Sequence, residues 1–242
     1  MIKEVPESMQ RTSFAFGAIM FVAAAAFALK AQAQTTNLQQ VLAKMDASSA
    51  KFEDTEADIS VDLYTAVVQD HSTQTGTSAF RRAGGSMEMV THLRTNNGQP
   101  AETDLLYKNG ELDVYQPALK QETILSAGAN RAEYDSMLAT GFGAASKDLE
   151  AAWTVTFQGM ETVDGVQTAK LDLVPKDQNI RNNFSHVVIW VDLDRDISLK
   201  QAMFQPDGDS RTVTYSNIRY NQHPPARLFT LHIPSGTQVQ RR

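Results

Sequence analysis

The sequence contains no cysteine in its 242 residues. This absence excludes a disulfide framework, catalysis by a thiol and a metal site with cysteine ligands. Positive charge is also scarce, because 22 lysine and arginine residues stand against 28 acidic ones, a formal net charge of −6. A net negative chain without a basic cluster argues against binding to nucleic acid, whose phosphates attract lysine and arginine. The hydrophobic share, 42%, is that of a globular protein.

Patterns typical of catalytic and metal sites are missing as well. Asp192, Asp194 and Asp196 resemble the start of a calcium loop. That loop requires glycine at its sixth position and glutamate at its twelfth, where this chain has Ile197 and Met203. We interpret the run as an acidic hairpin turn. The five histidines lack metal-ligand spacing and no serine stands in a nucleophile motif, so the sequence predicts no metal, no cofactor and no catalysis.

Residues 1–33 have the three parts of a secretory signal. Basic residues precede the apolar run 12–29, and a small-x-small cleavage site, Ala-Gln-Ala, stands at 31–33. We predict cleavage after this site, which leaves residues 34–242 as one domain outside the cytoplasm. The alternative is an uncleaved membrane anchor, because the apolar run is close to the shortest length that spans a bilayer.

Hydrophobic periodicity predicts one helix followed by a sheet. Leu38, Val41, Leu42 and Met45 share one helical face. From residue 57 the period is two, which is typical of antiparallel strands with one covered face. We expect "DHSTQTGTS" (residues 70–78) to be a polar turn, and Asn109-Gly110 to close a hairpin.

The second half of the chain repeats the strand pattern after an alanine-rich insert. Residues 130–153 lack alternation, and Gly141-Phe142-Gly143 breaks them into two short helices. Further strands are expected at "WTVTFQG", "TAKLDLVP", "HVVIWVD", "SLKQAMF", "RTVTYSNI" and "LFTLHIP". The predicted fold class is α+β, a strongly curved antiparallel sheet or half-barrel with a few helices over its concave face.

One face of this sheet offers a large apolar surface. An ordinary core sealed by helices would explain it, but the predicted helices are few and short for so wide a sheet. We therefore predict an open apolar groove that binds acyl chains, with methionines suited to flexible ligands. The candidate lining residues are Ile59, Val61, Leu63, Met87, Met89, Leu93, Leu112, Val114, Met137, Leu138, Phe142, Val155, Phe157, Leu171, Leu173, Val187, Ile189 and Val191.

The order of motifs resembles the LolA-like family, the periplasmic outer-membrane lipoprotein-sorting carriers. The matching segments begin with "LLYKNGELDVYQPALKQ" (105–121) and "LATGFGAASKDLEAAWTVTFQGMETVDGVQTAKLDLVPKD" (138–177). They continue with "VVIWVDLDRDISLKQAMFQPDGD", "TVTYSNI" and "LFTLHIPSGTQV". Together they cover nearly all of the predicted mature chain.

This resemblance implies a soluble periplasmic carrier that holds acylated lipoprotein or lipid cargo for transfer to the outer membrane. An inner-membrane transporter and an outer-membrane receptor are the implied partners, and we expect a monomer. A family arginine that holds the lid over the cavity is matched here by Arg82 in "AFRRAGG". Two alternatives stay open: an envelope sensor or assembly factor that binds a protein with the same fold, and an envelope hydrolase.

Overall fold

The computed structural model describes residues 37–128, 131, 135 and 138–242. Contacts divide the chain into two compact units, residues 1–40 and 41–242, and each is considered by itself. The predicted signal segment and Met137 lie outside the described residues. The sheet belongs wholly to the second unit. In the described part of the chain no helix is long and apolar enough to cross a membrane.

Residues 41–49 form a helix, as the periodicity predicted. Val41, Leu42 and Met45 are buried, so the apolar stripe is the face that packs. At its last turn two serine hydroxyls donate to backbone carbonyls far along the chain. Ser48 Oγ donates to the carbonyl of Leu193 (2.8 Å), and Ser49 Oγ donates to that of Gly143 (2.8 Å).

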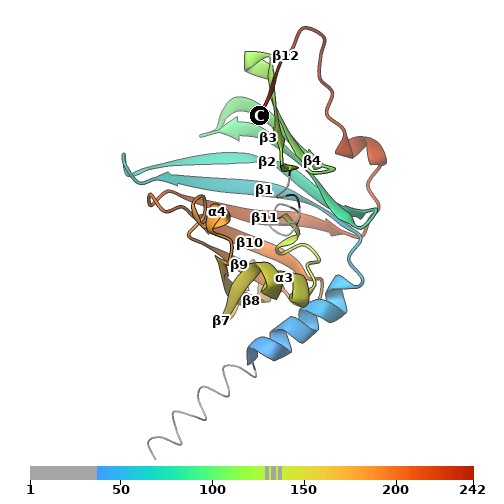
Figure 1. Ribbon diagram of the computed structural model, residues 1–242, viewed down its shortest axis with the longest axis vertical. Coiled ribbons are helices and arrows are strands. Elements are labelled where there is room, and N and C mark those ends of the chain that lie inside the picture. The colour runs from blue at the N-terminus through green and yellow to red at the C-terminus, as the bar shows by residue number, and fades with distance from the viewer. Residues whose placement is uncertain (1–36, 129–130, 132–134, 136–137) are drawn as a thin grey trace, which may run out of the picture. The chain divides into compact units, whose positions relative to one another are not determined.

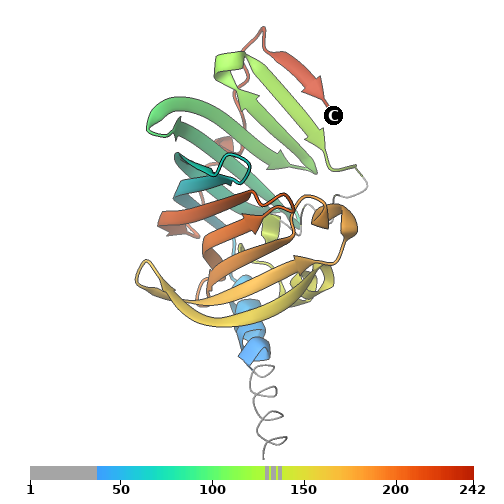
Figure 2. The same cartoon turned by 90° about the vertical axis from the view of Figure 1, so that its left-hand side faces the viewer.

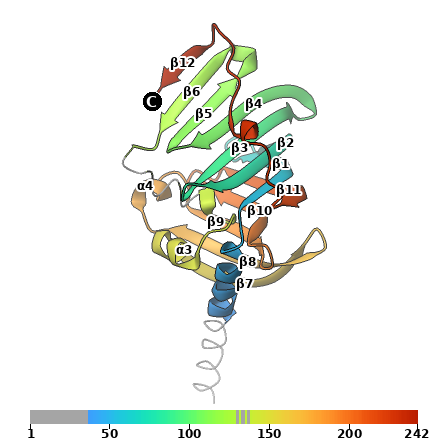
Figure 3. The same cartoon turned by 90° about the vertical axis from the view of Figure 1, so that its right-hand side faces the viewer.

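The strands form one twelve-stranded sheet in the order β12-β6-β5-β4-β3-β2-β1-β11-β10-β9-β8-β7 (Figure 1). It is open and curved (Figures 2 and 3). Four short helical segments connect described strands: η1 (Pro117–Leu119), α3 (Ser146–Ala152), α4 (Gln178–Arg181) and η3 (Ala226–Phe229). The strands are β1 (Asp54–Thr65), β2 (Asp70–Ala83), β3 (Ser86–Asn96), β4 (Gln99–Lys108), β5 (Glu111–Gln116), β6 (Gln121–Ser126), β7 (Trp153–Val163), β8 (Val166–Pro175), β9 (His186–Asp192), β10 (Ile197–Phe204), β11 (Ser210–Tyr220) and β12 (Gln238–Arg241).

The expected large curved sheet with few helices is confirmed, with one difference in strand direction, while the helices over its concave face stay a prediction. Neighbouring strands are antiparallel except for β12, which runs parallel to β6. The sheet is therefore mixed at this edge. The reason is the path of residues 221–237. This segment leaves the central strand β11 and reaches the edge of the sheet formed by β6, where β12 begins. The Asn109-Gly110 hairpin is confirmed, and both residues have the positive φ (55° and 80°) that such a turn requires.

The expectation of a turn at residues 70–78 is wrong. These residues are the first part of β2 and pair with β1 along its full length, from Asp54↔Arg81 to Thr65↔Asp70. The turn consists instead of residues 66–69. Serine and threonine are tolerated in this strand because the outer part of the long hairpin is largely solvated, and threonine is a good strand former.

The expected strand "LFTLHIP" is also wrong. Its first residues belong to η3, and residues 230–237 are irregular. Phe229 is completely buried against Ala79, Val90 and Leu106 on the outer face of the sheet. The Arg81 guanidinium lies 4.1 Å from the centre of the Phe229 ring. The apolar residues of the motif thus anchor a connecting segment, because prolines on both sides prevent strand pairing.

Candidate functional site

The strand register places the strand residues predicted to line a groove on one face of the sheet. Paired residues of neighbouring strands share a face. Val61 pairs with Val213, Val213 with Gln201, Gln201 with Ile189, and Ile189 with Leu171. Two-residue alternation extends this face, which we call the inner face, along each strand.

The same face continues into the first half of the sheet. Phe80 pairs with Met89, Met89 with Tyr107, and Tyr107 with Leu112. Predicted residues that are buried are Ile59, Val61, Met87, Phe142, Leu171, Leu173, Val187, Ile189 and Val191. Those that are half-buried are Leu63, Met89, Leu93, Leu112, Val114, Leu138, Val155 and Phe157. Their common apolar face is a fact of the structure, and their binding of lipid stays a prediction.

Phe142 fills the centre of the inner face in this structure. Its ring stacks on Phe80, with 3.8 Å between centroids and 11° between planes, and it meets the edge of Tyr215 at 5.1 Å. Its backbone forms a bridge with Ile197. Phe142 is 2% exposed, so its side chain is buried against the inner face.

The glycines on both sides of Phe142 are required by geometry. Gly141 and Gly143 have φ of +82° and +71°, which disfavour any side chain. A Cβ on Gly141 would lie 2.0 Å from Ser198 Oγ, and one on Gly143 would lie 2.6 Å from a ring carbon of Phe52. The backbone at positions 141 and 143 therefore lies so close to Ser198 and Phe52 that only glycine fits there. The predicted helix break is confirmed.

Arg82 donates from Nη2 to the carbonyl oxygen of Gly143, 2.7 Å away. Ser49 donates to the same oxygen. The amide of Gly143 donates in turn to the carbonyl of Asp196 (3.0 Å). The family resemblance implies that Arg82 holds a lid, and that role stays a prediction.

Asp196 is a buried acid beside this contact that sequence reasoning missed. Its side chain is inaccessible to solvent, and neither carboxylate oxygen has a hydrogen-bond partner. Burial, reinforced by the negative charge of Asp46, raises the pKa of Asp196 from 3.8 to about 8, although the Arg82 charge opposes the shift. The acid therefore holds its proton at neutral pH. Asp196 looked like an ordinary turn residue, and only long-range packing buries it.

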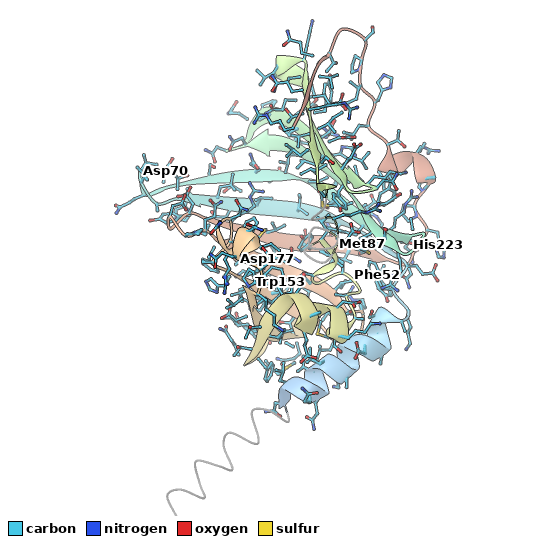
Figure 4. All side chains as sticks on the ribbon, viewed as in Figure 1. Phe52, Asp70, Met87, Trp153, Asp177 and His223 are labelled. Carbon is cyan, nitrogen blue, oxygen red and sulfur yellow. The ribbon has the colours of Figure 1, made fainter. Side chains whose placement is uncertain are left out.

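A groove of about 900 Å³ opens beside the glycine segment. Its walls come from the β2–β3 turn, residues 143–145, α3 and the start of α4. Met87 and Asp177 mark two parts of the wall (Figure 4). Met87, one of the predicted apolar lining residues, borders this groove. Arg82, the predicted lid-holding residue, lines it as well. The volume is within the range of roughly 300–1,000 Å³ found for ligand sites.

The acidic run at residues 192–196 is a hairpin turn, as interpreted from the sequence. Asp192 ends β9, pairs with Ile197 of β10, and accepts hydrogen bonds from the Asp194 amide and from Arg195. Around the residues that the structure describes, no group of three or more histidine, aspartate or glutamate side chains could hold a metal ion.

Comparison with known proteins identifies the family to which this open curved sheet belongs. Residues 55–219 match the family model of the MucB/RseB N-terminal domain. The chain belongs to this family, and the LolA-like resemblance is confirmed as a family-level prediction. No curated protein sequence matches the chain.

Several solved structures share the fold at low sequence identity. An uncharacterised conserved protein from Thermus thermophilus has a TM-score of 0.52 and 10% identity, over 85% of this chain and 99% of its own. MucB has a TM-score of 0.50 and 12% identity, over 85% of this chain and 66% of its own. A LolA superfamily protein from Nitrosomonas europaea has a TM-score of 0.40 and 14% identity, over 80% of this chain and 97% of its own.

Proposed function

We propose that this protein is a periplasmic carrier that binds the acyl chains of lipoproteins or lipids between the inner face of the sheet and residues 138–152. The observation that carries the proposal is the largely apolar inner face, against which the aromatic side chain of Phe142 packs from a segment with a glycine on each side. Each buried methylene of a ligand contributes about 0.8 kcal/mol to binding, so burial of an acyl chain on such a face provides enough free energy for binding without polar contacts.

Cargo reaches the inner face only when Phe142 leaves it. The described contacts that oppose this movement include the hydrogen bonds of Arg82 and Ser49 to the Gly143 carbonyl and of Gln201 to the Thr140 carbonyl. The backbone bonds of residues 141 and 143 and the stacking of Phe142 on Phe80 add to them. Burial of a phenylalanine side chain contributes about 1.5–3 kcal/mol and the Arg82 hydrogen bond a similar amount, which the burial of about four to eight ligand methylenes at about 0.8 kcal/mol each would offset. The exchange is nearly balanced, and release to a partner needs such a balance.

A titration of the full chain with a fluorescent acyl probe tests the proposal. We expect saturable binding that Val61→Asp weakens at least about tenfold, because a charge on the inner face cannot be desolvated by an acyl chain. Asp62→Asn is the matched control, since the neighbouring residue points to the other face and should leave binding unchanged. Failure of the wild-type protein to bind the probe, together with lipid-free protein in native mass spectrometry, would refute the carrier role.

The second candidate is a module that binds a protein segment in the groove. The specific observation is its charged lining, which includes the cations Arg82, Lys147 and Lys176 and the acids Asp148 and Asp177. Charges of both signs suit a peptide better than a hydrocarbon. Competition between a lipopeptide and the same peptide without its acyl chain separates the two functions, because equal competition favours the protein-binding module.

A further inference from the structure

The turn between β1 and β2 exposes two adjacent valines. Val67 is 89% exposed and Val68 is 67% exposed. Other hairpins of the sheet use the expected turn residues, as at Asn109-Gly110 and Asp164-Gly165. Valine favours strands, and burial would remove its side chain from water, so neither local backbone geometry nor packing within the chain accounts for valines at this tip.

The tip is held in position by the neighbouring turn. The amide of Ala66 donates to Asp209 Oδ1 at 2.8 Å, and the amide of Asp209 donates to Asp207 Oδ1 at 3.1 Å. Gln69, with φ of +52°, closes the turn through a bond from its amide to the Ala66 carbonyl (3.3 Å). A surface that is already ordered loses little conformational entropy when it binds.

The charges around the tip have one sign. Asp70 directly follows the β1–β2 turn, and Asp207 and Asp209 belong to the adjoining turn. The segments 64–70 and 204–210 contain no lysine or arginine. The next residue, Arg211, pairs with Leu63 and so lies on the inner face. An anionic phospholipid surface would repel this tip, whereas an apolar pocket with basic residues at its rim would attract it.

We propose that Val67 and Val68 dock into an apolar pocket of a partner protein whose rim carries lysine or arginine. Asp70, next to this turn, lies at the far end of the hairpin from Phe52 (Figure 4). Asp70, the first residue of β2, is twelve residues from Arg82, roughly 40 Å at the rise of a strand, so docking of the tip leaves the groove free. The proposal is therefore independent of what the groove binds.

The absence of cysteine makes a direct test possible. In the full chain, Thr65→Cys, at an exposed position beside the turn, creates a single thiol that can carry a benzophenone maleimide while both valines remain, and irradiation with an envelope fraction captures what the tip contacts. We expect one protein adduct whose cross-linked peptide is apolar and flanked by lysine or arginine. Adding Val68→Asp should lower its yield at least about tenfold, and so should 0.5 M salt.

The control is Ala101→Cys, which places the same label on an exposed strand position. A protein adduct of equal yield from this position would overturn the proposal, as would a yield that ignores Val68→Asp. Adducts confined to phospholipid, or to a second copy of this chain, would also overturn it. Unchanged circular dichroism and unfolding midpoints of the labelled variants show that a lost adduct reflects lost docking.

Discussion

Replacing Asp196 by asparagine should remove a pH dependence of stability that a single buried acid creates. The folded protein raises the pKa of Asp196 to about 8, while the unfolded chain releases this proton near pH 3.8. Between these values the unfolded state binds fewer protons than the folded state, so the free energy of unfolding falls as pH rises. Above pH 8 and below pH 3.8 this contribution is constant.

The expected magnitude follows from the pKa difference. Linkage with these two pKa values predicts a loss on the order of 4 kcal/mol in the free energy of unfolding between pH 4.5 and pH 7.5. An asparagine side chain in place of Asp196 cannot ionise, and asparagine tolerates the left-handed backbone (φ of +53°) at this position. Its buried amide lacks partners and costs about 1–3 kcal/mol, but this cost is the same at both pH values.

The assay is urea unfolding of the full-length wild type and of Asp196→Asn at pH 4.5 and 7.5. The asparagine variant should gain about 4 kcal/mol relative to wild type between the lower and the higher pH. Asp194→Asn is the matched control, because Asp194 is exposed in the same turn and should follow the wild type. Parallel pH profiles for wild type and Asp196→Asn, within about 1 kcal/mol, would show that Asp196 is ionised in the folded protein.

Three further substitutions test the contacts that hold the site. Arg82→Ala removes the hydrogen bond to the Gly143 carbonyl and should lower the free energy of unfolding in urea by about 1.5–3 kcal/mol, with faster amide exchange at residues 142–143. Arg82→Lys should recover part of this loss of stability, and equal losses in both variants would contradict the assignment. Gly143→Ala should destabilise by at least about 2 kcal/mol through steric overlap and strain, whereas Gly165→Ala, with open space around it, should show only the strain of about 1–2 kcal/mol. Phe229→Ala should cost about 3–5 kcal/mol, against less than about 0.5 kcal/mol for the exposed Leu119→Ala, and a melting curve unchanged by Phe229→Ala would refute the anchoring role of η3.

Local sequence was sufficient where one strong signal decides the structure. Alternation between apolar and polar residues identified the inner face, because the two-residue period of a strand separates its faces without reference to neighbours. Asn109-Gly110 identified its hairpin because few residues other than glycine and asparagine adopt positive φ at low cost. At the Ala66–Gln69 turn no such residue occurs in the centre, and at "LFTLHIP" the apolar run was mistaken for a strand. Both errors arose where a local pattern competed with the pairing of distant segments.

The amino-acid sequence by itself determined the kind of surface this protein presents: an apolar sheet face, a glycine-flanked phenylalanine and an excess of negative charge. Tertiary structure alone decided what covers that face and how the cover is held. Phe142 meets Phe80, Arg82 meets Gly143, and Asp196 loses its solvent only because segments more than fifty residues apart pack together. Burial and desolvation depend on all neighbouring segments at once, so no local pattern in the chain encodes them.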